Sequence, residues 1–536
     1  NAEWYVQDTW KITRRLTLDY GMRFAWIQPQ YESTGLASGF RPENYNPAQA
    51  VRLYYPGTDA NGNSVAVDRA TGQTLGSFAV GRVVPNSGNF LNGVVIGGEN
   101  GVSKYLMRDR GIHYGPRFGL AFDVLGNQTL VIRTGGGIFY DRYQGNRAFA
   151  MTNNPPNAVP AQVNYGLVSE LNSGVALAAV PSLRSFDVGG EVPTVYNYQF
   201  GIQYKLPFEL VLDTSYVGSL SRHLQAQVNL NAIPYGTRFK PENASVTNRD
   251  FLRPYMGFGD ITYYKADASA NYNSLQVTVN RRMASRLFFG LSYTWSKALT
   301  TASGDGDFQR IDENNRKANY GLADFHRAHN LAVNWVYEIP VFAGSNAVVK
   351  HTLGGWQLSG VFQYQTGQPD NISFSIPGIN NENLTGSFTE GARIRLIGDP
   401  TAGFTKDPYH QLNPSAFLPP TAGSAENPLA QIGMEAPNRY FIRPGINTWT
   451  LSLQKAFSIK ERASLQFRID AFNVFNHTQF SDIQRTANYA NLQSTTPSNL
   501  PTFDAARNLW VNPTGFGAVT AVRDPRIVQL MTRFQF

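Results

Sequence analysis

The sequence predicts an all-β chain that forms an antiparallel, up-and-down β-barrel in a membrane. Three observations favour this fold. Segments of about ten residues with alternating apolar and polar side chains recur along the chain, as in strands that face two environments. The connections between these segments alternate between short and long. The last segment ends on Phe536 without a polar tail.

The composition narrows the class of protein. Of the 536 residues, 16% are charged and 13% are aromatic, which is little charge and much aromatic surface for a soluble protein. The net charge is +8, but Lys and Arg are scattered without a basic run, so nucleic-acid binding is not favoured. No apolar run approaches the about 18 residues that indicate a transmembrane helix. The chain has no cysteine, which fits passage through an oxidising periplasm but decides little.

The first predicted hairpin joins strand 4–12 to strand 16–26 through a break at 13–15. In 16–26 every even-numbered residue is apolar, from Leu16 to Trp26, and this length crosses a tilted bilayer. Further predicted hairpins lie at 117–124 with 130–140, 195–206 with 209–218, 274–282 with 286–297, 330–339 with 355–366, and 447–457 with 463–475. With the final strand, about 13 strands are predicted. Bacterial single-chain barrels have an even number of strands, so this odd number predicts part of a larger barrel.

The connections carry the strongest signal. Short ones are predicted at 13–15, 125–128, 207–208, 283–285, 340–353 and 458–462, and long ones at 27–114, 141–193, 219–272, 298–327, 367–445 and 476–525. Outer-membrane barrels have tight turns on the periplasmic side and long loops outside. If the C-terminus is periplasmic, every short connection falls on the periplasmic side. A β-sandwich or propeller gives no reason for this alternation.

The final strand has one largely apolar face. We predict that four of its residues form the signal that the barrel assembly machinery reads, with the apolar face toward outer-membrane lipid: Phe536, Phe534, Leu530 and Val528. The alternative for this segment alone is the edge strand of a soluble sheet.

Eight charged residues fall on the polar side of their strands: Asp19, Arg23, Arg117, Asp123, Arg133, Asp213, Arg468 and Asp470. An Arg or Lys that faces the middle of the lipid costs roughly 2–4 kcal/mol, so we predict that this side faces the barrel lumen. A mutual structural network is favoured over substrate contact. Substrate selection is expected in the long loops.

No catalytic, metal or cofactor site is predicted. His326 and His329 fall on opposite faces of a predicted strand, which suits structural histidines better than metal ligands. The acidic loop at 303–315 has Arg310 where a calcium loop needs glycine. Gly135, Gly136 and Gly137 lie inside a strand, and no GxSxG motif occurs, so an enzyme is not expected.

Several stretches resemble the barrel region of TonB-dependent outer-membrane receptors, specifically the Oar-like group of Gram-negative bacteria. They are YVQDTWKITRRLTLDYGMRF (5–24), PRFGLAFDVLGNQTLVIRTGGGIFYDR (116–142), YNSLQVTVNRRMASRLFFGLSYTWSKAL (272–299), DFHRAHNLAVNWVYEIP (324–340), LQFRIDAFNVFNHTQF (465–480) and the ending DPRIVQLMTRFQF. The resemblance implies a barrel of about 22 or more strands with a plug inside it. It also implies a regulatory-like domain and an N-terminal segment that engages the TonB complex.

The chain opens with strand-like sequence, NAEWYVQDTW, without the charged start and apolar run of a signal peptide. We therefore expect a single partial barrel domain over 1–536 whose signal peptide, regulatory-like domain and plug lie outside it. The resemblance implies active, TonB-dependent uptake of a scarce or bulky substrate that the sequence does not identify. The alternatives are a passive pore or a surface-binding adhesin barrel without TonB coupling, and a secreted soluble β-protein.

Overall fold

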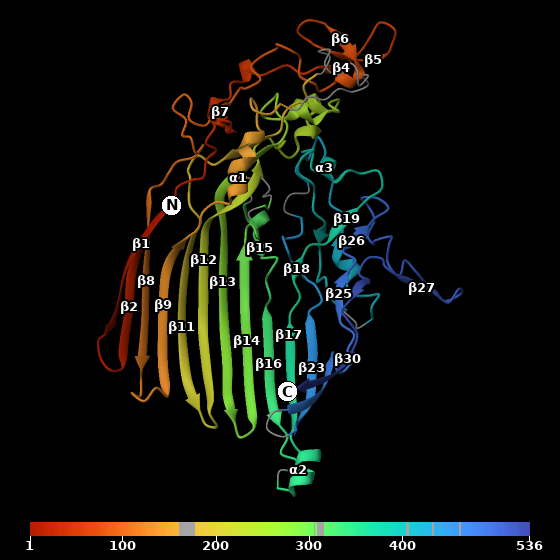
Figure 1. The fold of residues 1–536 in the computed structure, drawn as a ribbon. Coiled ribbons are helices and arrows are strands. Elements are labelled where there is room, and N and C mark those ends of the chain that lie inside the picture. Colours follow the sequence, from red (N-terminus) through yellow and green to blue (C-terminus); the bar gives the residue numbers. More distant parts are fainter. Residues whose placement is uncertain are drawn as a thin grey trace.

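The computed structural model describes residues 1–159, 177–304, 306–307, 316–342, 344–403, 407–430, 434–459 and 463–536. Thirteen long strands form one curved antiparallel sheet (Figure 1). They are β1 (Ala2–Lys11), β2 (Leu16–Trp26), β8 (Ile112–Asp123), β9 (Leu130–Tyr140), β11 (Thr194–Leu206), β12 (Leu210–Asn229), β13 (Ile261–Ala284), β14 (Leu287–Thr300), β16 (His329–Glu338), β17 (Trp356–Gln365), β23 (Ile446–Ile459), β24 (Ala463–Phe472) and β30 (Ile527–Gln535).

The order of these strands in the sheet is their order in the chain, which confirms the predicted up-and-down arrangement. Tight turns lie at one end of the sheet and the long connections gather at the other (Figure 1). Gln535 pairs with Ser464, next to the turn that joins β23 and β24, so the C-terminus lies at the tight-turn end. Within the described residues β1 and β30 do not pair, and the sheet is open between them.

Two strands are much longer than the alternation predicts. β12 continues to Asn229 and β13 begins at Ile261, so the connection between them spans 230–260 and not 219–272. The added stretches pair with each other, as in Ala226 opposite Lys265, with irregularities in the register. In the added part of β12 apolar residues still alternate with polar ones, but Arg222 interrupts the apolar series and His223 has a positive φ of 56°. The pairing with β13 becomes irregular at the same point, so the continuous period of two ends there.

The long connections fold into a loop layer, which comprises the described residues of 27–111, 141–193, 230–260, 301–328, 366–445 and 473–526. Its strands are β3 (Ser38–Phe40), β4 (Tyr55–Thr58), β5 (Ser64–Val67), β6 (Thr74–Gly76), β7 (Val94–Ile96), β10 (Leu183–Phe186), β15 (Gly321–Leu322), β18 (Pro369–Asp370), β19 (Ser373–Ser375), β20 (Arg395–Leu396), β21 (Phe417–Leu418), β22 (Phe441–Ile442), β25 (Phe480–Ile483), β26 (Thr486–Asn488), β27 (Thr502–Asp504), β28 (Leu509–Val511) and β29 (Val519–Val522). Its helices are α1 (Gly145–Ala150) and α3 (Asn381–Leu384), while α2 (Ala347–Leu353) lies at the tight-turn end. No helix in the described part of the chain is long and apolar enough to cross a membrane.

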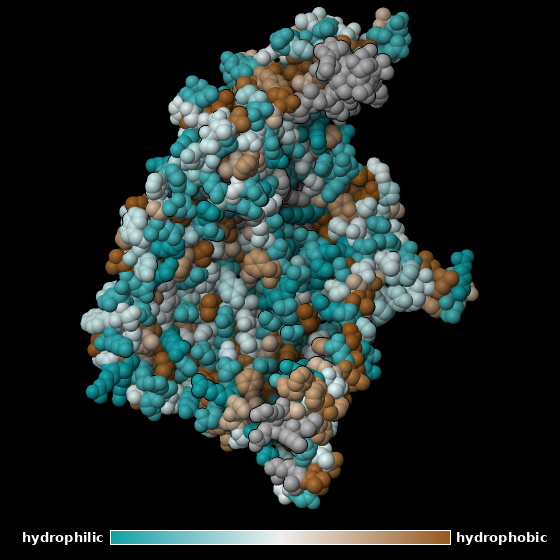
Figure 2. Space-filling view, viewed as in Figure 1, coloured by the Kyte–Doolittle hydropathy of each residue, from teal (hydrophilic) through white to brown (hydrophobic). Residues whose placement is uncertain are grey.

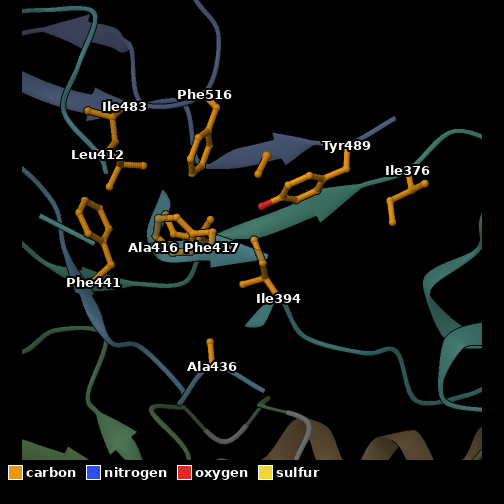
Figure 3. Close-up of a cluster of buried hydrophobic side chains, with 12 residues drawn as sticks. Ile376, Ile394, Leu412, Ala416, Phe417, Ala436, Phe441, Ile483, Tyr489 and Phe516 are labelled. Carbon is orange, nitrogen blue, oxygen red and sulfur yellow. The ribbon is translucent and has the colours of Figure 1, made fainter. Parts of the chain in front are cut away.

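Most of the buried core lies in the loop layer. The largest cluster joins 366–445 to 473–526 and includes Phe417, Phe441, Phe516 and Tyr489 (Figure 3). The parallel pairing of β19 with β26 crosses the same boundary. These two connections, far apart in the sequence, therefore fold as one unit beyond the ends of β17, β23 and β24.

Candidate functional site

The eight charged residues predicted on the polar side share one face of the sheet, which we call the polar face. Directly opposed residues in an antiparallel pair lie on the same face. Asp19 is opposite Gly119, which is opposite Gly135. The register continues in this way across the sheet to Ser452, which is opposite Asp470. The opposite face, which carries Leu18 and Leu291, is the apolar face.

The structure does not bring these eight residues into one network. Only Arg468 and Asp470 contact each other, with Arg468 Nε 2.8 Å from Asp470 Oδ1. Arg133 donates to Gln203 Oε1 at 2.6 Å, and Thr9 donates to Asp19 Oδ1 at 2.6 Å.

The remaining four residues also have local contacts of their own. Arg23 pairs with Glu3, and Asp213 accepts from Ser215 at 3.0 Å. Arg117 lies over the Phe139 ring, and Asp123 accepts from the backbone of its turn. They form a series of small polar contacts across the face and not a single site.

The four residues predicted as an assembly signal lie along β30. Val528, Leu530 and Phe534 are opposite Ala471, Ile469 and Leu465 on the apolar face, and they are exposed. The ring of Phe536 lies 5.9 Å from that of Phe534. These residues form an apolar margin along the last strand of the described sheet.

A cavity of about 870 Å³ lies at the loop end of β17 and β23. Four aromatic rings contribute to its wall, and amide side chains and one guanidinium supply polar groups. The aromatic residues are Tyr364, Phe441, Phe475 and Phe480, and the polar ones include Gln365, Gln411, Asn447, Gln479 and Arg443. Aromatic faces combined with a few polar groups are typical of small-molecule sites.

Ion pairs hold the two sides of this cavity together. Arg443 Nη2 lies 2.9 Å from Asp482 Oδ1, and Arg443 Nη1 lies 3.7 Å from Asp370 Oδ2. Arg485 also pairs with Asp370 and lies 3.8 Å from Asp482. Two guanidinium groups and two carboxylates therefore balance each other where the connection 366–445 meets 473–526.

The neighbouring loop carries extra positive charge and a buried histidine. Burial, followed by the charges of Arg443 and Arg523, holds the pKa of Arg327 below its usual range. Burial also lowers the pKa of His326, with Arg327 and Lys297 adding to the effect. The Ala298 amide donates to His326 Nδ1 at 3.3 Å, so this neutral ring acts as a backbone acceptor.

The two histidines that the sequence singles out have different hydrogen-bond partners. His329 Nδ1 contacts the Tyr293 hydroxyl at 2.9 Å, whereas His326 Nδ1 accepts from the Ala298 amide. Among the described residues there is no group of three His, Cys, Asp or Glu that could hold a metal ion. Most of the acidic loop 303–315 lies outside the described residues.

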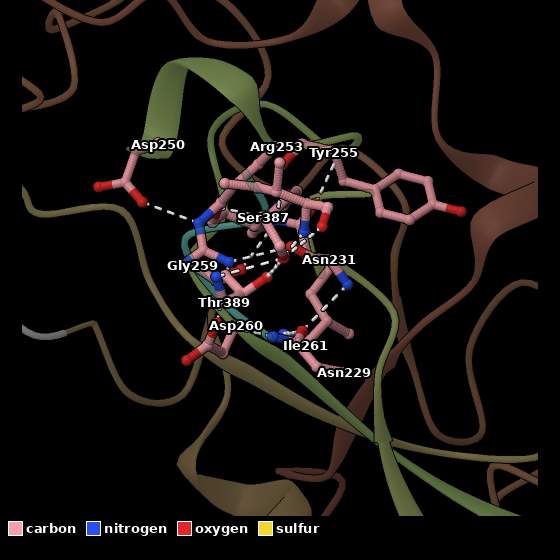
Figure 4. A network of polar contacts seen from close by, with 12 residues as sticks. Asn229, Asn231, Asp250, Arg253, Tyr255, Gly259, Asp260, Ile261, Ser387 and Thr389 are labelled. Carbon is pink, nitrogen blue, oxygen red and sulfur yellow. Dashed lines mark hydrogen bonds and ion pairs between the residues drawn. The ribbon is translucent and has the colours of Figure 1, made fainter. Parts of the chain in front are cut away.

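A buried polar network fixes the connection 230–260 (Figure 4). Asn231 donates to three backbone carbonyls, those of Tyr255, Phe258 and Gly259, at 2.8–3.1 Å. Arg253 lies within 2.8 Å of both Asp250 and Asp260.

The same network also contacts the connection 366–445. Ile233 N donates to Thr389 Oγ1 at 2.9 Å, and Ser387 Oγ donates to the Ile233 carbonyl. Burial alone raises the pKa of Asp260, but its contacts with Arg253 outweigh this and leave the pKa below its ordinary value. The network therefore depends on an ionised carboxylate.

The fold and these surfaces agree with the comparison of the sequence to protein families. The model of the outer membrane beta barrel domain matches residues 1–529. The chain belongs to this family. Its place is therefore the outer membrane, as the alternating strands predict. In that setting we expect the apolar face to meet lipid.

Solved structures of outer-membrane proteins are similar at low identity. The outer membrane transporter YddB from Escherichia coli is 10% identical over 90% of this chain and 51% of its own, with a TM-score of 0.40. The siderophore receptor PiuA from Acinetobacter baumannii is 8% identical over 99% and 42%, with a TM-score of 0.39. The ferric yersiniabactin uptake receptor FyuA from Yersinia pestis is 9% identical over 100% and 45%, with a TM-score of 0.37.

The chain spans about half the length of these structures. No curated protein sequence matches it significantly. The family match and the strands themselves place the chain in the outer membrane.

Proposed function

We propose that the chain is the barrel portion of a TonB-dependent outer-membrane receptor of the Oar-like group, which takes up a scarce or bulky substrate. The observation that carries the proposal is the continuous polar face across an open sheet of thirteen strands. Lipid does not tolerate unpaired strand edges, so in this proposal further strands close the sheet. A barrel of about 22 strands encloses a lumen that needs a plug, whereas a passive porin has about 16–18.

In this proposal the polar face lines the barrel lumen. A plug, formed by residues that do not belong to the described sheet, lies in that lumen and is supported by this face. Arg133, Arg468 and the other polar-face charges would contact the plug or one another. The substrate first meets the loop layer and its cavity beside Arg443. The TonB complex then supplies energy through the N-terminal part that the resemblance implies, and no cofactor is required.

A surface-binding barrel without TonB coupling is the second candidate, favoured by one observation. The hairpin of β27 and β28 projects away from the sheet (Figure 1). Its Phe503 and Leu509 are exposed, while Trp510 stacks on Tyr409 with ring centroids 3.9 Å apart. A rigid projection with exposed apolar side chains suits adhesion to a surface.

Nutrient depletion separates these functions. Three strains are compared: the parent, one that lacks this protein, and one that lacks TonB. We expect the same compounds to remain in the spent medium of both deletion strains. Compounds that remain only when this protein is absent would indicate a passive pore. Equal depletion by all three strains, with surface attachment lost in the first deletion, would indicate an adhesin.

The proposed partner in assembly is the barrel assembly machinery, which would read the apolar end of β30. We expect deletion of Phe536 to lower the amount of folded protein in the outer membrane, measured by heat-dependent mobility on gels. The Phe536→Tyr variant keeps an aromatic ring and should assemble normally. Normal levels of the deletion variant would contradict this role.

A further inference from the structure

The connection between β16 and β17 differs from the other turns at its end of the sheet. It contains the helix α2 (Ala347–Leu353), whereas the turn between β1 and β2 spans only four residues, 12–15. Asn346 Oδ1 accepts from the Val349 amide at 2.9 Å at the start of the helix. The chain therefore forms a capped helical turn here, at the lower tip of the molecule (Figure 1).

This helix packs against the apolar face of the sheet. The His351 ring meets the Phe457 ring edge-on, with centroids 5.9 Å apart. Phe457 is opposite Leu465, which is opposite Phe534, so all three lie on the apolar face. The contact places α2 on the lipid-facing side, beyond the ends of the strands.

A lysine on the apolar face is buried in this region. Lys455 is opposite Trp356 and Phe467, and its side chain is 2% exposed. Its ammonium donates to the Gly354 carbonyl, just after α2, and lies 4.7 Å from the Phe457 ring centre. A charge on the lipid face is tolerated near the interface, where its cost falls to about 0–1 kcal/mol. The Gly354 carbonyl and the rings of Trp356 and Phe457 therefore surround this ammonium group.

Apolar side chains on the same connection have no cover within the described residues. Val348 is 71% exposed and Leu353 is 52% exposed, and Val341 and Phe342 are also exposed. Figure 2 shows apolar residues at this lower tip. These side chains lie past the tight-turn end of the sheet, on the connection whose helix contacts Phe457 of the apolar face. In the outer membrane, the neighbour that we expect beside the apolar face is lipid, and the same lipid can reach these side chains.

We propose that the described residues of the connection 341–353 form a membrane-interface anchor. Val348, Leu353, Val341 and Phe342 insert among the phospholipids of the periplasmic leaflet, and α2 lies along the headgroups. Interfacial helices are held by shallow insertion of apolar side chains of this kind. The anchor fixes the depth of β16, β17 and β23 in the membrane. The inference rests on the family and not on transport, so it stands or fails independently of TonB coupling.

The test uses the absence of cysteine from the chain. Single variants Val348→Cys and Leu353→Cys of the full-length protein are labelled with an environment-sensitive fluorophore and folded into phosphatidylethanolamine–phosphatidylglycerol vesicles. Leu291→Cys, on the apolar face, is the lipid control, and Arg14→Cys, in the turn between β1 and β2, is the water control. Brominated phospholipid and aqueous iodide serve as the two quenchers.

We expect brominated lipid to quench labels at 348 and 353 within a factor of about two of the label at 291, as shallow insertion requires. Iodide should quench them less than the label at 14. Strong iodide quenching at 348 and 353, equal to that at 14, would overturn the proposal. Protection from both quenchers would also overturn it, because another protein segment would then cover the helix.

Discussion

The sheet and the loop layer place the same kinds of side chain in opposite surroundings. In the sheet, Phe200 and Leu530 are 48% and 78% exposed on the apolar face. In the loop layer, Phe417 and Tyr489 are fully buried. The sheet is held by its backbone hydrogen-bond ladder, and we propose that lipid covers its apolar face, whereas the loop layer buries apolar surface from water. Apolar side chains therefore have different surroundings in the sheet and in the loop layer, and substitutions should act differently in each region.

The largest effect is expected in the loop core. Phe417 is fully buried and meets Phe516 edge-on at 5.6 Å. Phe417→Ala should destabilise the unit formed by 366–445 and 473–526 by about 3–5 kcal/mol, the cost of removing a core aromatic ring. Hydrogen exchange of β19 and β26 should rise, while heat-dependent gel mobility shows the barrel still folded.

The matched control is Phe503→Ala, because Phe503 is exposed in the same unit, on the connection 473–526. It should leave hydrogen exchange unchanged. If Phe417→Ala also unfolds the barrel, the two regions are one cooperative unit and the comparison fails.

The next effect concerns the two faces of a single strand. Leu291 is opposite Val279 and Val333 on the apolar face, and Ser292 is opposite Thr278 and Ala332 on the polar face. Leu291→Arg should cost about 2–4 kcal/mol in the free energy of unfolding from vesicles, because its guanidinium faces lipid. Ser292→Arg should cost much less. Equal losses in denaturant titrations would mean that the faces are wrongly assigned.

The sequence predicted the sheet where lipid imposes a period of two. β2 and β9 occupy the predicted residues, 16–26 and 130–140. The ends of β12 and β13 were not predicted, because Arg222 and the irregular pairing between Ser221 and Ala226 interrupt the alternation there. The face on which each charged residue lies followed from its odd or even position along the strand. The observed register places all eight of these charged residues on the polar face.

The contacts of the loop layer could not be predicted from local sequence. Arg443 meets Asp482, and Ser387 meets Ile233, across long separations in the chain. No spacing rule links such partners, because loops pack through shape and polar complementarity and not through a repeat. The cavity beside Arg443 was missed for the same reason, since its wall comes from several separate segments.

A smaller effect is expected from the polar network that joins the connection 230–260 to the connection 366–445. Asn231 is fully buried and donates to three carbonyls. Asn231→Ala leaves these groups and the Tyr255 amide without their partner, at a cost of about 1–3 kcal/mol. Hydrogen exchange at 255–261 should increase. Asn61→Ala, at an exposed position, is the control, and an equal response to both would show that the network is not structural.

The smallest effect is expected from pH, through His326. Burial and the neighbouring charges of Arg327 and Lys297 lower its pKa in the folded loop, so the neutral ring is favoured. Its contribution to stability is therefore complete above the ordinary histidine value of about 6.5 and is lost as the pH falls through the lowered value. Protonation also removes the acceptor for the Ala298 amide. Acid should thus loosen 298 and 323–326 in the wild type.

His326→Asn separates this titration from other effects of acid. The Asn side chain can still accept from Ala298 but does not ionise. Hydrogen exchange measured at several pH values, with the variant and the wild type compared at each pH, removes the intrinsic pH dependence of exchange. The wild type should lose protection relative to the variant only at acidic pH. A constant difference would mean that His326 acts by its shape and not by its charge, and the loop layer would then lack this sensitivity to acid.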